Sequence, residues 1–429
     1  MIKIKSVRGM NDITPQDIKV WQFLESSIRR TFSSYGYEEI RFPIVEETQL
    51  FDRSIGEMTD IVSKEMYSFE DKKGLDISLR PEGTAGCVRA CIENNLLRTD
   101  LPRLWYLGPM FRYERPQKGR SRQFHQASLE AYGMSGPDID AEIILVSQRL
   151  WKNLGIEKNL YLELNSLGNK KIREKYKSAL RSFLETYKRD LDSDLLRKLE
   201  SNPLRILDSK SEEIKIILSE APQINEFLEK DALKHFDGLT KILDQLGVPY
   251  KLNTKLVRGI DYYDNTVFEW KTDKLGSQDA VCAGGRYDRL VEELGGNSCP
   301  AVGFSMGMER LVLLLQNSSS NSWRKSECVE VYFVCLSERC IPDVLDYAEK
   351  IRKEIPHVNL KVNLGLEKAK KQFKKADKTG ARFTLIVGEE ELKEKTIILK
   401  DMRANSPQNP YPLSQIIEKL KLFSFEGEV

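Results

Sequence analysis

Residues 108–133 read GPMFRYERPQKGRSRQFHQASLEAYG, and this stretch decides the fold. The apolar run from Leu104 to Phe111 predicts a strand that delivers Arg112 at its end. The loop that follows is basic, with Arg115, Lys118, Arg120 and Arg122. A second strand then carries His125, Gln126 and Glu130. A fixed arginine beside a mobile basic loop suits two anionic partners: a small phosphate or carboxylate held rigidly, and a larger polyanion held loosely.

A solvated hairpin loop is the simplest interpretation of these charges. Gln126 and Glu130 argue for more than that. They are four residues apart, so on a strand they point to the same face. Polar side chains on that face, between Phe124 and Tyr132, indicate a lined pocket.

The composition sets limits on domain number and on partners. A chain of 429 residues is long enough for two or three domains. The formal net charge is only +2, so a nucleic-acid partner would have to be bound by local basic patches.

Several classes of protein are not expected from this chain. No apolar run reaches the ~18 residues needed to span a bilayer, and the N-terminus MIKIKSVRGMND lacks a signal core. We therefore expect a cytoplasmic protein with no membrane partner. The seven cysteines form no C-x-x-C pair and there are three histidines, so neither a structural zinc site nor a disulfide framework is expected.

The N-terminal half mixes helices and short strands. Thr14-Pro15-Gln16-Asp17 predicts a helix start, and an apolar stripe runs from Ile18 to Phe32. Residues 39–45 predict a short strand, and Pro43 favours an edge or interface position for it. Gly83 and Gly86 flank the start of another helix, and residues 140–154 predict a helix closed by Gly155.

The texture changes between about residues 169 and 237, where Lys, Glu and Leu recur at helical spacing and indicate a helical insertion. Strand texture returns from Leu252. A polar linker, NSSSNSW, occupies 317–323. The β-α-β rhythm beyond it predicts a small, separate α/β domain.

Three further segments could carry chemistry, and each also has a structural interpretation. In RPEGTA, residues 80–85, Glu82 could bind an ammonium group or cap a helix. In LVRGIDYY, residues 256–263, Arg258 could bind an anion or be an exposed strand residue in a salt bridge. In GFSMGMERL, residues 303–311, the glycines permit either close packing or the approach of a planar base.

Taken together and in order, these segments resemble the class II histidyl-tRNA synthetases through essentially the whole chain. The matching stretches are FRYERPQKGRSRQFHQ, AVGFSMGMERL, LVRGIDYYDNTVFE and AGGRYDRLVEELGG. The resemblance implies an α+β fold: a class II core on an antiparallel sheet over residues 1–325, with the helical insertion at 169–237, and a C-terminal α/β anticodon-binding domain over 326–429. The absence of GxGxxG and GxxxxGK[ST] agrees, because this fold needs neither fingerprint.

The resemblance also implies roles for individual residues in ligating L-histidine to its tRNA. Glu82, Thr84 and Gln126 would hold the α-amino group, with Gly83 beside them. Glu130 and Tyr263 would address the two sides of the imidazole, with Tyr262 and Tyr287 lining the pocket. The reacting phosphates would meet Arg112, Arg258 and Arg310.

The implied partners are ATP with its Mg²⁺, histidine tRNA and a second copy of the chain, without a resident metal. The tRNA acceptor end would meet Arg115, Gln117, Lys118, Arg120 and Arg122, although Ser121 stands where the family often has an aromatic residue. A basic stripe on the C-terminal domain would follow tRNA phosphates, or be a merely solvated face; it comprises Lys371, Lys374, Lys375 and Lys378.

Two alternatives and one excluded role complete the expectations. A histidine-sensing regulatory paralogue would lack ligase activity and typically the anticodon domain, whereas this chain keeps Arg258, Arg310 and about a hundred C-terminal residues. A different class II synthetase would need another side-chain pocket. His125 is expected to be structural, because the attacking carboxylate of histidine is already ionised and needs no base.

Overall fold

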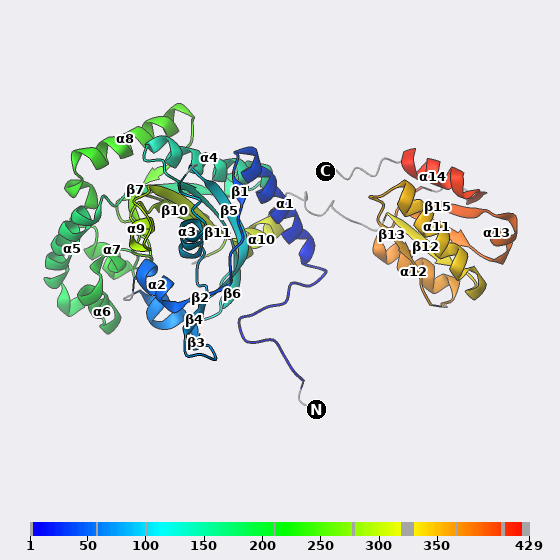
Figure 1. The fold of residues 1–429 in the computed structure, drawn as a ribbon, viewed down its shortest axis with the longest axis horizontal. Helices are drawn as coiled ribbons and strands as arrows, with labels where there is room; N and C mark the ends of the chain where they lie inside the picture. Colours follow the sequence, from blue (N-terminus) through cyan, green and yellow to red (C-terminus); the bar gives the residue numbers. More distant parts are fainter. Residues whose placement is uncertain are drawn as a thin grey trace. The chain divides into compact units, whose positions relative to one another are not determined.

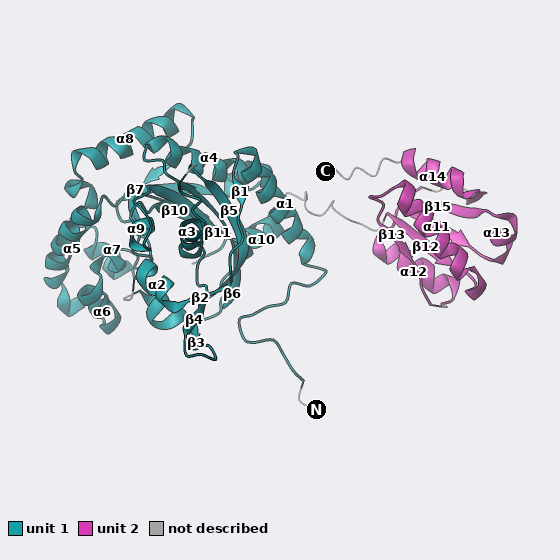
Figure 2. Cartoon of the chain, viewed as in Figure 1, with its two compact units in different colours: residues 1–320 teal, residues 321–429 magenta. Residues whose placement is uncertain are grey.

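The computed structural model describes residues 3–56, 59–98, 101–209, 211–276, 279–318, 330–365, 367–404 and 408–422. The chain forms two compact units, Met1–Ser320 and Asn321–Val429 (Figure 2). The domain boundary expected between residues 325 and 326 lies outside the described residues.

The first unit is built on an eight-stranded sheet whose order is β1-β5-β6-β11-β10-β9-β7-β8. The strands in this order are Glu38–Glu39, Arg103–Phe111, Gln123–Tyr132, Ala301–Gly307, Ala280–Arg286, Asp264–Lys271, Tyr161–Ser166 and Lys251–Leu252. The inner pairs are antiparallel, and only the outermost strands β1 and β8 pair in parallel. The predicted antiparallel core and the predicted β5–β6 hairpin are both confirmed.

Alternation along the central strands separates an apolar face from a polar one. Trp105 of β5 lies against Phe32, with ring centroids 5.9 Å apart, so odd-numbered residues of this strand face the first helix. On β6, Glu130 pairs with Leu104 of β5 and with Gly303 of β11. Its neighbour Tyr132, on the same side of the strand, donates to Cys87 on the opposite face of the sheet. Glu130 therefore belongs to that second face.

Helices cover both faces of this sheet (Figure 1). Those on the apolar face are α1 (Ile18–Ser34), α4 (Pro137–Leu154), α8 (Lys230–Gln245) and α10 (Met308–Asn317). Those on the opposite face are α2 (Thr48–Ile55), α3 (Thr84–Glu93) and α9 (Leu290–Glu293). The predicted strand-to-helix step from β11 to α10 is confirmed.

Two predicted elements at the N-terminus differ in the structure. Helix α1 begins at Ile18 because the Thr14 hydroxyl bonds the Asp17 side chain at 2.8 Å instead of capping a backbone amide. The strand predicted at 39–45 is split. Its parts join β1 and the small sheet of β2 (Val45–Glu47), β4 (Asp76–Leu79) and β3 (Tyr67–Glu70). Between them, the carbonyls of Phe42 and Pro43 accept from the Arg80 side chain, which replaces a strand partner.

The predicted insertion is helical but extends further than expected. Its helices are α5 (Lys170–Glu185), α6 (Ser193–Ser201), α7 (Glu212–Ile217) and α8. Asn169 caps α5 by accepting from the Ile172 amide at 3.0 Å. Helix α8 continues past residue 237 to Gln245 because Gly238 does not end it; a Cβ at this glycine would lie 2.8 Å from Pro137 of α4.

The second unit is a small α/β domain, as predicted. Its five-stranded sheet has the order β13-β12-β14-β15-β16. The strands in chain order are Val331–Cys335, Leu360–Val362, Phe383–Val387, Ile397–Asp401 and Asn409–Tyr411. The helices are α11 (Ile341–Glu354), α12 (Ala369–Thr379), α13 (Glu389–Glu394) and α14 (Leu413–Leu422). Strands β13, β12 and β14 are parallel, β15 is antiparallel to β14, and β16 is antiparallel to β15.

Candidate active site

A cavity of about 510 Å³ lies over the polar face of the central strands. Eight of the residues predicted from sequence line it: Glu82, Arg112, Arg120, Gln126, Arg258, Tyr262, Tyr263 and Arg310. They come from the turn before α3, the β5–β6 hairpin, α10 and the loop before β9. Segments far apart in the sequence therefore form one site. Four arginines and Lys271 line the cavity together with six carboxylates, so an anionic ligand can bind where it replaces a carboxylate partner of an arginine.

Glu130 lies beneath this cavity and is 1% exposed. Its Oε1 accepts from the Thr84 hydroxyl at 2.9 Å and from the Tyr106 hydroxyl at 3.0 Å, and its Oε2 accepts from the Tyr287 hydroxyl. Burial raises the pKa of Glu130 to about 8, against the stabilising effect of the three hydroxyls. Three predicted residues, Thr84, Glu130 and Tyr287, are thus assembled into one buried hydrogen-bonded group.

Glu82 satisfies both interpretations of its segment. Its carboxylate accepts from the backbone amides of Thr84 at 2.6 Å and Ala85 at 2.9 Å, so it caps the start of α3. The same carboxylate lines the cavity, and burial raises its pKa. Because each oxygen holds one amide and can accept another donor, a capping role leaves room for an ammonium group.

Gln126 and the two tyrosines complete the side of the cavity above Glu130. Among the described residues the buried Gln126 Oε1 has no hydrogen-bond partner, and a buried polar atom of this kind is costly unless a ligand satisfies it. Tyr262 and Tyr263 pack together with ring centroids 4.7 Å apart, and Tyr262 also contacts Tyr287 at 5.6 Å. This corner therefore offers acceptors and aromatic walls to a small polar ligand.

Arg112 enters the cavity from the end of β5, as the sequence predicts. Its Nε donates to the Pro81 carbonyl at 2.8 Å, and its guanidinium lies 5.2 Å from the centre of the Phe124 ring. These contacts hold the stem of the side chain, while the Nη atoms lie at the cavity wall near Glu114, 3.9 Å from Nη1. The guanidinium is preorganised for an anion.

Arg258 does not lie on a strand. Residues 253–263 form a loop between β8 and β9, so the strand expected for Arg258 is wrong. Its guanidinium forms an ion pair with Glu269 of β9 and lies 5.6 Å from the Tyr263 ring centre. The buried Nε has no partner among the described residues. Arg258 therefore reaches the cavity from this loop, whereas Arg112 reaches it from the end of β5.

Arg310 closes the remaining side of the cavity from the first turn of α10. It donates to the carbonyls of Gly119, at 3.3 Å, and Ala280. Burial, and next the positive charge of Arg120, lower the pKa of the Arg310 guanidinium. An anion beside it would offset that repulsion.

The predicted basic loop divides into two parts. Gln117 and Arg120 exchange backbone hydrogen bonds of 3.0 Å, which makes Lys118-Gly119 a tight turn. Arg115, Gln117 and Lys118 are exposed at the tip. Arg120 instead turns into the cavity and pairs with the buried Glu114, and Arg122 stacks on Tyr113, 3.7 Å from the ring centre. Three of the five residues predicted to contact tRNA are therefore fully exposed, and Arg120 and Arg122 are partly exposed.

His125 is structural, as expected. Glu309 accepts from its backbone amide at 2.9 Å and contacts Nδ1 at 3.1 Å, and Trp21 packs edge-on at 5.1 Å. The imidazole does not line the main cavity. Ser121 lines it and accepts from Asn11 at 3.3 Å, so this position supplies a hydroxyl and no stacking surface.

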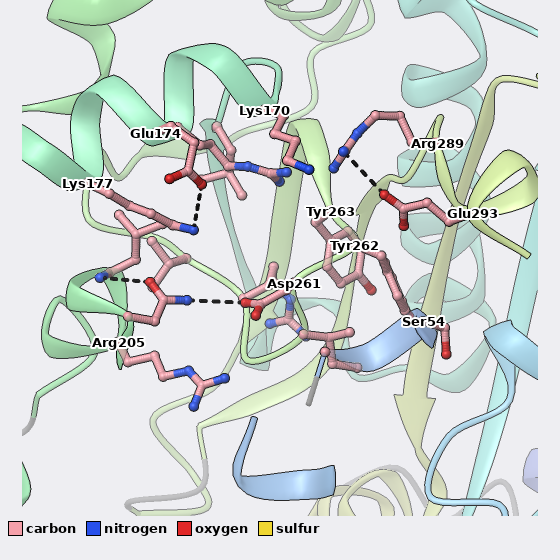
Figure 3. Close-up of a pocket in the computed structure, with 18 of the residues that line it drawn as sticks. Ser54, Lys170, Glu174, Lys177, Arg205, Asp261, Tyr262, Tyr263, Arg289 and Glu293 are labelled. Carbon is pink, nitrogen blue, oxygen red and sulfur yellow. Dashed lines mark hydrogen bonds and ion pairs between the residues drawn. The ribbon is translucent and has the colours of Figure 1, made fainter. Parts of the chain in front are cut away.

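A second cavity of about 240 Å³ lies beside the first, between α2, the helical insertion and α9 (Figure 3). Arg258, Ile260, Tyr262 and Tyr263 line both cavities. Figure 3 shows Asp261 near its centre, where Asn202 of the insertion donates to the Asp261 carboxylate at 3.2 Å. The loop that carries Arg258 and Tyr263 is thus fastened to the insertion from behind.

The lysines of the second unit lie on α12 and are exposed. Two of the four are paired: Lys371 contacts Glu367 at 2.7 Å, and Lys375 contacts the same carboxylate at 2.5 Å. No ion pair involves Lys374 or Lys378 among the described residues. Among the described residues, the positive charge of the predicted stripe is therefore least neutralised at Lys374 and Lys378.

The sequence did not point to the carboxylates that pair with these cations, or to the tyrosine that contacts Glu130. Glu114 and Glu269 neutralise Arg120 and Arg258, Lys271 bridges Glu163 and Glu269, and Tyr106 supports Glu130. The alternation in FRYE could have pointed to Glu114. Tyr106 had no signal, because it stands in an apolar run that reads as core.

The antiparallel core, its arginine-lined cavity and the separate α/β unit are the arrangement of class II aminoacyl-tRNA synthetases. Residues 9–311 match the sequence family described as histidyl-tRNA synthetase, and residues 330–422 match the anticodon binding domain. The chain therefore belongs to the histidyl-tRNA synthetase family.

Solved structures agree with this assignment. Apo histidyl-tRNA synthetase of S. aureus is 33% identical, with a TM-score of 0.80 over 98% of this chain and 100% of that one. Histidyl-tRNA synthetase of Nostoc sp. PCC 7120 is 20% identical, with a TM-score of 0.69 over 98% and 100%. A Bacillus halodurans C protein described as an ATP phosphoribosyltransferase regulatory subunit/histidyl-tRNA synthetase is 20% identical, with a TM-score of 0.65 over 90% and 98%. The last two share the fold.

Among the described residues, no helix is long and apolar enough to cross a membrane. In the same part of the chain, no group of three or more His, Cys, Asp or Glu side chains is placed to hold a metal ion.

Proposed function

We propose that the protein ligates L-histidine to its tRNA in two steps: formation of histidyl-adenylate from ATP with release of pyrophosphate, then transfer of histidine to the tRNA 3′ end. The observation that carries this proposal is the convergence of Arg112, Arg258 and Arg310 on one cavity whose wall, at Glu82, is joined through Thr84 to the buried Glu130 group. One part of the cavity suits phosphates, and the other suits a small molecule with donor groups.

Histidine is proposed to lie above Glu130. Its imidazole N–H donates to the Glu130 carboxylate, and Tyr263 addresses the other side of the ring. Its ammonium group is held by Glu82, Gln126 and Thr84, where Gln126 Oε1 lacks a protein partner. An amino acid without the imidazole N–H would leave buried polar atoms unsatisfied, and sites of this kind discriminate by roughly 10⁴-fold or more.

The first step joins two anions, because the histidine carboxylate attacks the α-phosphorus of ATP. Arg112 and Arg258 lie on the cavity wall from different segments and are proposed to contact the carboxylate and the α-phosphate together. Arg310 is proposed to hold the terminal phosphate. The protein contributes position and positive charge rather than a base, as phosphoryl-group chemistry generally requires.

Mg²⁺ is proposed to arrive with ATP. Glu114, Glu269 and Asp279 line the same cavity, and carboxylate oxygens are ligands that Mg²⁺ accepts alongside phosphates. Glu114 and Glu269 would lose an ion-pair partner as ATP takes over Arg120 and Arg258. The ion would supply further neutralisation of phosphate charge.

The tRNA is proposed to contact both units. The exposed Arg115, Gln117 and Lys118 meet the acceptor end, and Arg120 and Arg122 support that loop from within. The match of residues 330–422 to an anticodon binding domain supports a second contact there, with α12 following phosphates. A second copy of the chain is also a proposed partner, supported by the exposed Ile44, Val45 and Phe69; a single-chain mass in solution would contradict it.

The alternative is a regulatory paralogue that binds histidine without activating it. The Bacillus halodurans protein carries that description and shares the fold. Amino-acid-dependent ATP–pyrophosphate exchange separates the two functions. We expect exchange with histidine and none with other amino acids; binding of histidine without exchange would establish the alternative, and equal exchange with other amino acids would refute histidine as the substrate.

Paired substitutions test the contribution of α12 to tRNA binding. Lys374→Ala with Lys378→Ala is expected to weaken tRNA binding several-fold and to reduce the slope of log K against log[salt] by about 1 to 2, because no carboxylate of the described residues pairs with these lysines. Lys371→Ala with Lys375→Ala is the matched control, and its effect should be smaller because Glu367 already neutralises part of that charge. Filter binding over a salt series measures both. Equal losses would contradict the assignment.

A further inference from the structure

The donors around Glu130 are distributed unequally between its two oxygens. Oε1 accepts two hydroxyls, from Thr84 and Tyr106, and Oε2 accepts one, from Tyr287. Each carboxylate oxygen has about two lone-pair sites. Oε1 is therefore filled, whereas Oε2 can accept one more donor.

The backbone of β11 fixes where Oε2 lies. Gly303 of β11 is the residue opposite Glu130, and a Cβ at this position would overlap Oε2. The carboxylate therefore fills the space over a residue that has no side chain, and its position is set by the sheet.

Tyr106 is held where its hydroxyl can act on the site through its buried neighbours Glu130 and Thr84. The side chain is 2% exposed and does not line the cavity. Phe42 packs edge-on against its ring at 4.9 Å, and the backbone of Gly83 lies so close that a Cβ there would overlap the ring. Besides Glu130, its hydroxyl lies 3.5 Å from the Thr84 hydroxyl.

We propose that Tyr106 is a positioning residue for histidine recognition: its hydroxyl fixes the Glu130 carboxylate and fills Oε1, so that the imidazole N–H is accepted by Oε2. The proposal rests on the proposed function, because it names the oxygen that receives the substrate. It adds a residue that lies outside the cavity and that the sequence motifs do not include.

The same hydroxyl influences the ionisation of Glu130. Burial raises the pKa of this carboxyl, and donation from Tyr106 acts in the opposite direction. The other ionisable groups that interact with its charge are Tyr287, Glu82, Cys87, Tyr132, Tyr262, Tyr263 and Tyr37. Removing the Tyr106 hydroxyl destabilises the carboxylate, so the pKa of Glu130 rises further.

Tyr106→Phe tests the inference in the full-length enzyme, because the ring that packs on Phe42 and Gly83 is kept. We expect the KM for histidine in pyrophosphate exchange to rise about tenfold, as for loss of a hydrogen bond to a charged group. The kcat and the KM for ATP should stay within about twofold. The pH below which kcat/KM for histidine declines should move upward, because Glu130 must be ionised to accept from a neutral imidazole.

Tyr132→Phe is the matched control. Tyr132 is also fully buried, and its hydroxyl contacts Cys87 at 3.4 Å and not Glu130. It should leave the KM for histidine and the pH profile unchanged. A second variant, Tyr106→3-fluorotyrosine, has a more acidic hydroxyl that donates more strongly, so the pH profile should move in the opposite direction to that of Tyr106→Phe.

The outcomes are distinguishable from failure of the proposed function, which would show as no histidine-dependent exchange by the unmodified enzyme. With the unmodified enzyme active, a Tyr106→Phe variant of unchanged KM and pH profile would overturn the inference. So would equal changes in Tyr106→Phe and Tyr132→Phe accompanied by equal losses of Tm, since these indicate packing alone. An unshifted profile for the fluorotyrosine variant would overturn it as well.

Discussion

Arg258→Ala is expected to reduce histidine-dependent pyrophosphate exchange by about a hundredfold to a thousandfold while tRNA affinity stays nearly intact. The size follows from loss of one preorganised group that stabilises developing charge, about 3–4 kcal/mol. The separation from tRNA binding follows from position, because Arg258 lines the cavity whereas the exposed Arg115, Gln117 and Lys118 of the loop tip do not.

The design must separate chemistry from folding. Removing Arg258 leaves Glu269 without its ion-pair partner, so Tm should be measured alongside exchange. Arg53→Ala is a suitable control: this exposed arginine lines only the smaller cavity and donates to Gln49 at 2.8 Å. Exchange by the control should match the unmodified protein. Comparable losses of exchange and tRNA affinity in Arg258→Ala would contradict the assigned role.

Glu130→Gln should lower kcat/KM for histidine by about a hundredfold. Glutamine keeps the shape but presents an NH₂ group toward hydroxyls that donate to both carboxylate oxygens. One of those donors, or the imidazole N–H, is left unpaired, and a hydrogen bond to a charged group is worth about 1.5–3 kcal/mol. The KM for ATP should change little. A histidine KM unaffected by this substitution would remove Glu130 from the binding site.

The same variant should be more stable than the parent in alkaline solution. Because burial raises the pKa of Glu130 from 4.5 to about 8, the folded state binds the proton more tightly than the unfolded state. The stabilisation present below pH 4.5 is lost as the pH rises through 8, by roughly 5 kcal/mol at most. Glutamine does not titrate, so the Tm difference should move in its favour between pH 5 and 8. A constant difference would show that Glu130 is not perturbed.

Local sequence signals predicted the central elements well. The β5–β6 hairpin, the start of α3 between Gly83 and Gly86, and the step from β11 to α10 all depend on neighbours within a few residues. The errors arose where distant residues decide the local backbone. The Arg80 side chain donates to the carbonyls of Phe42 and Pro43, which lie far from it in the sequence. Gly238 likewise packs closely against Pro137 of a distant helix.

The site shows the same division. Motif residues such as Glu82, Gln126 and Arg112 were found because they stand in short, recognisable segments, and the structure brings them to one cavity. Glu269 was not assigned a role, since its contact with Arg258 appears only once the loop folds back on β9. Tyr106 pairs with Glu130 across 24 residues, through the register of two strands. Such contacts follow from topology and not from composition.

The pairing of cavity arginines with carboxylates affects which anions can bind in the cavity. Arg258 and Arg120 already hold Glu269 and Glu114, so an incoming anion must displace a partner and gains only the difference between two ion pairs. A lone inorganic phosphate, which replaces one carboxylate with one anion, profits little from that exchange. A molecule with several phosphates, an aromatic base and its own accompanying cation can satisfy both the displaced acids and the freed arginines. The carboxylate partners of these arginines therefore weaken the binding of a lone phosphate more than that of a polyphosphate that brings its own cation.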